Sequence, residues 1–207
     1  MKFVHLRAKS FYSMSEGLMS PVLLVKKAAE EKLESVSLTD LNKTCGIVEF
    51  QQAAKKSAVK PIVGAEVSFQ SEMASQQKGI TNKMILLAES PLGYSNINKM
   101  LSRASLERTS GEVIFREAWF NSMSTQDIIC LSGFENSDLG LLLKKGLKEQ
   151  ALDLAEYLAS VFPNRFFLEV QRDGSPEFDS LTRAVVSISQ KTSIPLVATH
   201  PNLFENQ

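Results

Sequence analysis

The chain has 207 residues, of which 43% are hydrophobic and 22% charged, the composition of an ordinary globular protein with a sizeable core. Lysine plus arginine (23) equals aspartate plus glutamate (23), so the net charge is zero and gives no field that attracts a nucleic-acid backbone. We therefore expect no direct grip on DNA from this segment. The two cysteines stand far apart, as is typical of a reduced, cytoplasmic chain, and no apolar run is long enough for a membrane span.

Short apolar runs alternate with helical patterns along the whole chain. The first run, at residues 3–6, predicts a strand, and a serine–proline pair at 20–21 then marks a helix start, because serine caps a helix and proline fits its first turn. Further strands are predicted at 36–39, 60–69, 83–90, 127–133, 165–171 and 195–199. Helical spacing begins again at 47, 91, 147 and 176, residues 70–82 predict a polar loop or loose hairpin, and 116–120 a short helix.

Seven strands that alternate with helices predict an α/β fold with a parallel sheet, either closed into a barrel or open. No linker rich in proline, glycine or serine divides the sequence, so we expect one domain over residues 1–207. The chain ends soon after its seventh strand without a helix behind it. That ending favours a fragment of a longer chain.

The only histidines are His5 and His200, at the start of the first predicted strand and the end of the last. They could approach each other if the strands closed into a barrel. Two imidazoles make a poor metal site, however, because hydrolytic centres usually need three or more protein ligands. We interpret the pair as two unrelated, partly buried imidazoles.

A charged pattern follows in "HLRAKS", where Arg7 and Lys9 alternate with His5 and share one strand face. Two permanent cations repel a divalent metal ion and attract carboxylates. Carboxylates at or near predicted strand ends are Asp40, Glu66 and Glu169. Such pairs would be charge-assisted hydrogen bonds in a partly dry pocket, with the desolvation cost offsetting the Coulomb gain. The alternative that Lys9 points into solvent stays open.

Other catalytic signatures are absent from the sequence. It contains no G-x-x-x-x-G-K-[ST] phosphate loop, no G-x-G-x-x-G fingerprint and no G-x-S-x-G nucleophile elbow. Cys45 and Cys130 have no base near them in sequence, and we interpret them as small core residues.

Long segments nevertheless follow one another in a familiar order, among them "FVHLRAKSFYSMSEG", "SVSLTDLNKTCGIVEFQ", "MILLAESPLGYSNINKM", "FFLEVQRDG" and "PLVATH". They resemble the N-terminal PHP (polymerase and histidinol phosphatase) domain of bacterial replicative DNA polymerase III alpha subunits, in the proteobacterial form. The resemblance extends from residue 3 to about residue 204. It implies a distorted (β/α)7 barrel, which is a TIM-barrel-like fold.

Active members of this family hold up to three metal ions at the carboxyl ends of their strands and hydrolyse phosphoesters. By the resemblance, the ligand positions here have mostly lost their ligands. The vestigial metal pocket so implied consists of His5, Arg7, Lys9, Phe11, Asp40, Leu41, Glu66, Lys83, Phe134, Pro201 and Leu203. Of the ligand positions proper, only Glu66 keeps a coordinating side chain, and His200 falls one place early. We therefore expect no catalytic residue, no metal and no cofactor in this chain.

The resemblance further implies what the chain does. We expect an inactive PHP domain in which Arg7 and Lys9 replace the positive charge of a metal by pairing with Glu66 and Asp40. Its implied partners are the remainder of the polymerase alpha chain and the separate proofreading exonuclease subunit, for which it would be a structural and docking module. The whole protein would be a DNA-directed DNA polymerase, a nucleotidyltransferase of DNA replication. The alternative is a residual metal-dependent phosphoesterase or 3′–5′ exonuclease.

Overall fold

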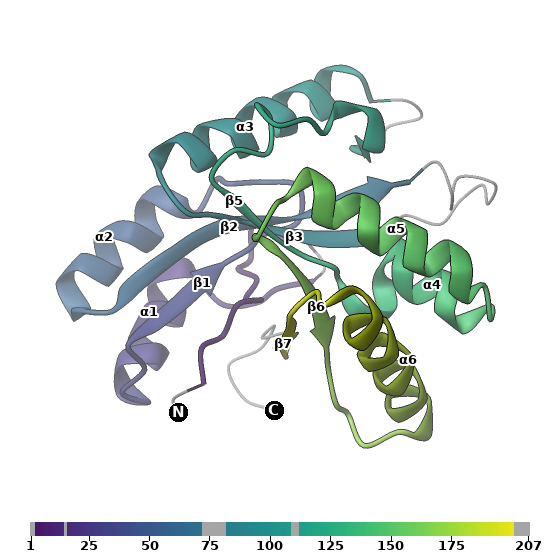
Figure 1. Ribbon diagram of the computed structural model, residues 1–207. Helices are drawn as coiled ribbons and strands as arrows, with labels where there is room; N and C mark the ends of the chain where they lie inside the picture. The colour runs from purple at the N-terminus through teal and green to yellow at the C-terminus, as the bar shows by residue number, and fades with distance from the viewer. Residues whose placement is uncertain (1–2, 15, 72–81, 109–111, 201–207) are drawn as a thin grey trace. The chain divides into compact units, whose positions relative to one another are not determined.

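The computed structural model describes residues 3–14, 16–71, 82–108 and 112–200 (Figure 1). Helices and strands alternate through these ranges. The α-helices are α1 (Pro21–Glu30), α2 (Ile47–Ser57), α3 (Pro91–Leu106), α4 (Asp138–Lys144), α5 (Lys148–Val161) and α6 (Pro176–Thr192), and two 3-10 turns are η1 (Glu117–Trp119) and η2 (Phe134–Asn136). The strands are β1 (Ser35–Leu38), β2 (Lys60–Gln70), β3 (Asn82–Ala88), β4 (Phe115–Arg116), β5 (Ile128–Leu131), β6 (Phe166–Val170) and β7 (Leu196–Ala198).

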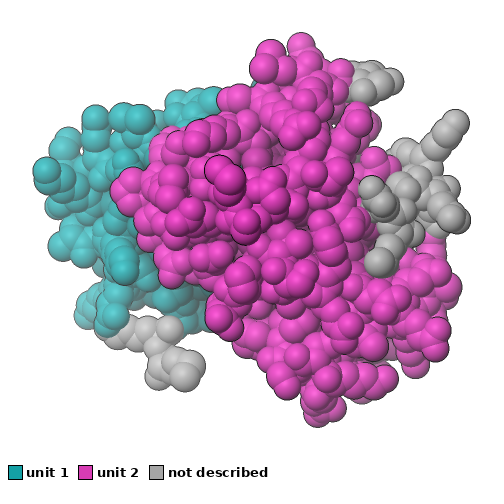
Figure 2. Space-filling model, turned by 45° about the horizontal axis from the view of Figure 1, so that its top comes forward, with its two compact units in different colours: residues 1–66, 199–207 teal, residues 67–198 magenta. Residues whose placement is uncertain are grey.

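The chain divides into two compact units, which Figure 2 colours separately. The first unit consists of residues 1–66 and 199–207, and the second of residues 67–198. Strand β2 contributes its first seven positions, 60–66, to the first unit and its last four, 67–70, to the second. That the chain forms one domain over residues 1–207 stays a prediction.

The first unit is built on a parallel pair of strands. β1 lies beside the first part of β2, with Ser35 opposite Lys60 and Leu38 opposite Val63. Helix α1 packs against α2. The buried side chains that form this core include Leu24, Val25, Val36, Leu38, Phe50 and Ala54. The Oγ of Ser20 accepts from the Leu23 N–H at 3.0 Å, so the capped start predicted for this helix is confirmed.

The predicted first strand at residues 3–6 is wrong. The chain bends at Leu6 and touches β1 only through isolated contacts. The Ser37 N–H donates to the His5 carbonyl at 2.9 Å, and the Thr39 N–H donates to the Ala8 carbonyl at 2.8 Å. The segment lies alongside β1, but the bend interrupts the continuous ladder that defines a strand.

The second unit contains a sheet of order β3-β5-β6-β7, and the end of β2 pairs with β4. Pairs β5–β6 and β6–β7 are parallel, as expected. Pair β3–β5 is antiparallel, with Ile85 opposite Leu131, which corrects the prediction of an all-parallel sheet. The reason is the connection before β3. A parallel crossover needs about a dozen residues or more, usually as a helix, and the interval 71–81 is too short for one.

Helices of the second unit pack on this sheet over a core that includes Ile85, Ile97, Leu131, Leu154, Leu168 and Val185. The predicted helix over 147–161 is confirmed as α5, and the predicted short helix at 116–120 is the 3-10 turn η1. Helix α4 was not predicted, because its short apolar sequence "DLGLLLK" shows no helical period. The predicted polar loop falls mostly on 72–81, outside the described residues. Among the described helices, none has both the length and the hydropathy needed to cross a bilayer.

Candidate functional site

The charged residues picked out by the sequence meet in the first unit, where β1 ends. The segment before α1 runs along β1, which brings the side chains that follow Ala8 to this end of the strand. Leu41, just beyond β1, forms a parallel bridge with Glu66, and the Asn42 N–H donates to the Glu66 carbonyl at 2.7 Å. The backbone of two neighbouring strands therefore fixes Glu66 beside the N-terminal segment.

Glu66 is held by two cations. Arg7 Nη2 donates to Glu66 Oε2 at 2.7 Å, and Lys9 Nζ donates to Glu66 Oε1 at 2.7 Å. All three residues are buried, with Glu66 0% exposed and Lys9 7%. The period-two spacing correctly predicted that Arg7 and Lys9 share one face. Lys9 does not point into solvent, so of the two readings left open by the sequence, ion pairing is the one confirmed.

A second carboxylate, Glu16, completes the cluster. Lys9 Nζ also donates to Glu16 Oε2, whose side chain is about one-third exposed. Two cations thus face two carboxylates. Sequence reasoning missed Glu16, because it lies seven residues from Lys9 in an irregular segment where no periodic pattern relates the two positions.

Asp40 makes a different set of contacts from the one predicted. Its carboxylate accepts from the Ser10 N–H at 2.7 Å, from Ser10 Oγ at 2.8 Å and from Ser13 Oγ at 2.6 Å. The predicted pairing of Asp40 with Arg7 and Lys9 is therefore wrong. Three neutral donors from the adjacent loop satisfy the buried carboxylate, and both cations are directed to Glu66. Asp40 thus anchors the loop that carries Lys9.

Three further pocket residues of the first unit have separate surroundings. Phe11 is 45% exposed, and its ring lies 4.7 Å from that of Tyr12. Leu41 is half-buried. His5 has a lowered pKa, because of its burial and, second, its electrostatic interaction with His200. This electrostatic interaction favours proximity of the two histidines, and their interpretation as two unrelated imidazoles stays a prediction.

The remaining predicted pocket residues lie elsewhere. Lys83 is the second residue of β3, in the second unit. Phe134 is also in that unit, fully buried, with its ring 5.2 Å from the ring of Phe178 in an edge-to-face contact. Pro201 and Leu203 are outside the described residues. The structure thus joins Arg7, Lys9 and Glu66 into one cluster.

Glu169, the third carboxylate predicted to lie near a strand end, is buried in the second unit. It accepts from the Gly133 N–H at 2.9 Å and from Gln171 Nε2 at 3.0 Å. Its local partners are therefore a backbone amide and a side-chain amide.

The residues present do not fit a divalent metal ion. Each oxygen of Glu66 already accepts from a cation, and an added ion would face the fixed positive charges of Arg7 and Lys9 at close range. Within the described ranges, no three His, Cys, Asp or Glu side chains form a group that could hold a metal. In the described residues, Glu66 instead pairs with Arg7 and Lys9 through charge-assisted hydrogen bonds.

Comparison with known proteins gives the family. A family model described as the PHP domain matches residues 5–173. The chain belongs to the PHP domain family. The PHP domain is 32% identical over 204 residues to the DNA polymerase III subunit alpha of Vibrio cholerae, and 33% identical over 205 residues to that of Escherichia coli K12. Each match covers 98% of this chain and 17% of the relative, so the chain spans about one-sixth of the length of these relatives.

A solved structure shows the same fold. The protein, from Bifidobacterium adolescentis, carries the provisional description of a metal-dependent phosphoesterase. It aligns with a TM-score of 0.54 and 11% identity, over 99% of this chain and 88% of its own. The predicted α/β, TIM-barrel-like fold class of the PHP domain is thereby confirmed.

Proposed function

We propose that this chain is the PHP domain of a DNA polymerase III alpha subunit and is there a catalytically inactive structural and docking module. One observation carries the proposal of inactivity, namely that both oxygens of the buried Glu66 accept from Arg7 and Lys9. The names of the relatives support the assignment to the polymerase. The whole protein would then be a cytoplasmic DNA-directed DNA polymerase, with its nucleotidyltransferase site in another part of the chain.

The chemistry of the cluster explains the proposed loss of activity. Metal-assisted hydrolysis needs a Lewis acid with an open position, where a bound water becomes a nucleophile near neutral pH. Guanidinium and ammonium groups have no such position, and Arg7 does not lose its proton in proteins. Arg7 and Lys9 can therefore balance the charge of Glu66 but cannot replace the reactivity of a metal. What this arrangement retains is a rigid, charge-balanced connection between the N-terminal segment and β2.

Elemental analysis of the purified chain tests the proposed loss of metal. After dialysis against zinc, manganese and iron in turn, followed by removal of loosely bound ion, we expect less than stoichiometric metal in each case. One tightly bound equivalent of any of the three would overturn the proposal. The variant Glu66→Gln would then show whether the metal is bound at this cluster.

The proposed exonuclease partner is tested by direct binding. The chain, immobilised at one end, should retain the purified proofreading exonuclease subunit when both are at micromolar concentration. The exonuclease subunit passed over an unrelated immobilised protein gives the background. No retention above that background would contradict the docking proposal, while the metal result would stand independently.

A residual phosphoesterase or 3′–5′ exonuclease is the alternative proposal. The observation that favours it is the retained carboxylate of Glu66, together with the electrostatic effect of His200 on the pKa of His5. Hydrolysis of an aryl phosphate in the presence of Mn²⁺ distinguishes the two proposals. We expect no turnover above the rate of the metal alone. Turnover that disappears in Glu66→Gln would establish the alternative instead.

A further inference from the structure

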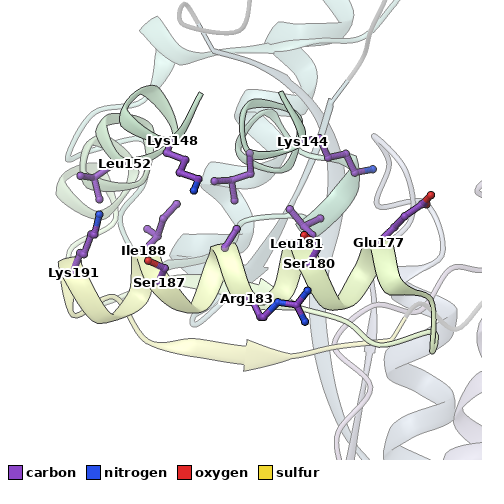
Figure 3. A pocket seen from close by; sticks show the side chains of 12 residues that line it. Lys144, Lys148, Leu152, Glu177, Ser180, Leu181, Arg183, Ser187, Ile188 and Lys191 are labelled. Atoms are coloured by element: carbon purple, nitrogen blue, oxygen red, sulfur yellow. The ribbon is translucent and has the colours of Figure 1, made fainter. Parts of the chain in front are cut away.

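The second unit contains a groove between helix α6 and the pair α4 and α5 (Figure 3). It has a volume of about 660 Å³. Its apolar lining comes from all three helices and consists of Leu143, Leu152, Leu181, Ala184 and Ile188. Leu143, Leu181 and Ile188 are already buried, while Leu152 and Ala184 are half-buried. The groove therefore offers a narrow apolar strip to an additional partner.

Positive charge lines both walls of the groove. Lys144 and Lys148 stand on one wall, and Arg183 and Lys191 stand on α6 opposite them. Lys144 has a partner, because its Nζ lies 3.0 Å from Glu135 Oε2. The lining contains only one carboxylate, Glu177 at one end. In a chain of zero net charge, this is a local excess of positive charge.

Three of these cations lack a counter-charge. In the part of the chain that the structure describes, no carboxylate lies within ion-pair distance of Lys148, Arg183 or Lys191. Figure 3 shows Lys148 and Lys191 extending into the space between α5 and α6 from opposite sides. Like charges that converge on one groove repel each other, and an anionic occupant would relieve that repulsion.

The length of the groove matches that of an α-helix of about four turns. The lining residues of α6 run from Glu177 to Lys191 at helical spacing, so this wall is about 21 Å long at a rise of 1.5 Å per residue. That length matches about four turns of a second helix. An amphipathic helix lays its apolar face into such a groove and keeps its polar flanks at the rims.

We propose that this groove binds an acidic amphipathic helix of a partner protein. The apolar face of that helix packs along Leu152 and Ala184. Its acidic flanks meet Lys148 on one wall and Arg183 and Lys191 on the other. Nucleic acid fits the groove less well, because its lining has no aromatic ring on which a base could stack. The proposal is independent of whether the partner is the exonuclease subunit.

Binding of a synthetic peptide tests the groove. The probe is a fluorescein-labelled helical peptide of about four turns, with leucines on one face and glutamates on both flanks. Fluorescence anisotropy should show saturable binding that weakens as salt rises. The same peptide with lysine in place of glutamate should not bind. A labelled oligothymidylate is the nucleic-acid probe.

Two matched double variants localise the binding. Lys148→Glu combined with Lys191→Glu reverses charge on both walls and should weaken peptide binding at least about tenfold, since each position exchanges an attraction for a repulsion. Lys55→Glu combined with Lys56→Glu changes the net charge equally on the exposed end of α2, and it should bind like the unmodified chain. Circular dichroism checks that both variants are folded.

Three outcomes would overturn the proposal. The first is that the acidic peptide does not bind at all. The second is equal weakening by the two double variants, which would mean that only net charge matters. The third is tighter binding of the oligothymidylate than of the acidic peptide, which would identify the groove as a nucleic-acid site.

Discussion

Glu66 is the residue on which the charged cluster depends. It is 0% exposed and is the shared partner of Arg7 and Lys9. Glu66→Gln keeps the shape of the side chain but removes the negative charge that Arg7 and Lys9 share. Removing one partner of a buried ion pair costs about 3–5 kcal/mol, so we expect a loss of that size in the free energy of unfolding, measured by urea denaturation.

The matched control for this prediction is Glu30→Gln in α1. Glu30 also contacts two cations, Lys26 at 3.8 Å and Lys27 at 3.6 Å, but its side chain is 48% exposed. Exposed ion pairs contribute about 0–1 kcal/mol, so the control should change stability little. Equal effects of the two substitutions would contradict the idea that burial makes the Glu66 cluster essential.

His5 gives the stability of the chain a pH dependence. Burial, and second the proximity of His200, lower the pKa of His5 below its usual value of 6.5 in the folded state. The unfolded chain therefore binds a proton at His5 more readily than the folded chain does. The contribution of neutral His5 to stability is complete above pH 6.5 and is lost as the pH falls through the lower folded pKa.

Urea denaturation between about pH 7 and pH 5 measures this effect. The unfolding free energy should decrease toward pH 5, and His5→Phe should make the decrease shallower, because phenylalanine keeps an apolar ring beside Phe3 and does not titrate. An unchanged slope in this variant would assign the pH dependence to other groups.

At the scale of elements, Asp138 joins three of them in the second unit. It is the first residue of α4 and 2% exposed, and it accepts from the Ser71 N–H just beyond β2, at 2.6 Å, and from Asn82 Nδ2 at the start of β3. Asp138→Ala leaves both donors without this acceptor. A buried donor that loses its acceptor costs about 1–3 kcal/mol, so for the two donors we expect a loss of about 2–6 kcal/mol in unfolding free energy.

Asp153→Ala is the control for Asp138, because it removes an exposed carboxylate from the neighbouring helix α5. Both variants are compared by thermal unfolding at a series of pH values. Because burial raises the pKa of Asp138, ionisation of this group disfavours the folded state, and its loss should cost most at low pH. A pH-independent loss, or one no larger than in the control, would argue against this connection.

Sequence patterns predicted the elements whose signals are local. Serine caps followed by proline correctly marked the starts of α1, α3 and α6, because capping and proline geometry act within one turn. Strand direction was not predictable in the same way. The antiparallel direction of β3 follows from a connection too short for a crossover, and the alternation of strands and helices favoured a parallel sheet even though residues 70–82 were interpreted as a loop or loose hairpin.

In the candidate site, too, the sequence predicted only what depends on local patterns. Arg7 and Lys9 were predictable as one face because side chains in an extended chain alternate. The resemblance to the family pointed to Glu66. The contacts of Asp40 with Ser10 and Ser13 depend on the path of an irregular loop, for which no sequence period exists. Hydrogen-bond partners on such a loop could therefore be identified only from the structure.

For the whole molecule, the distribution of charge favours binding to a protein over binding to DNA. The net charge is zero, the cations of the Glu66 cluster are neutralised, and the groove beside α6 carries only a local excess. Non-specific DNA binding comes from many phosphate contacts, and its dissociation constant is about 10⁻⁴–10⁻⁶ M at physiological salt. We expect the dissociation constant of this chain for duplex DNA to lie at or above the weak end of that range. An anisotropy titration of labelled duplex DNA should therefore not reach saturation.

The same DNA titration at low salt distinguishes the groove beside α6 from the exposed end of α2. Any binding that emerges there should be lost when Lys148 and Lys191 are both changed to glutamate, because several cations gather at the groove beside α6. It should persist when Lys55 and Lys56 are changed in the same way. Submicromolar binding at physiological salt with a steep salt dependence would contradict this expectation, since it requires many simultaneous phosphate contacts. The PHP domain would then bind DNA itself, in addition to any partner protein.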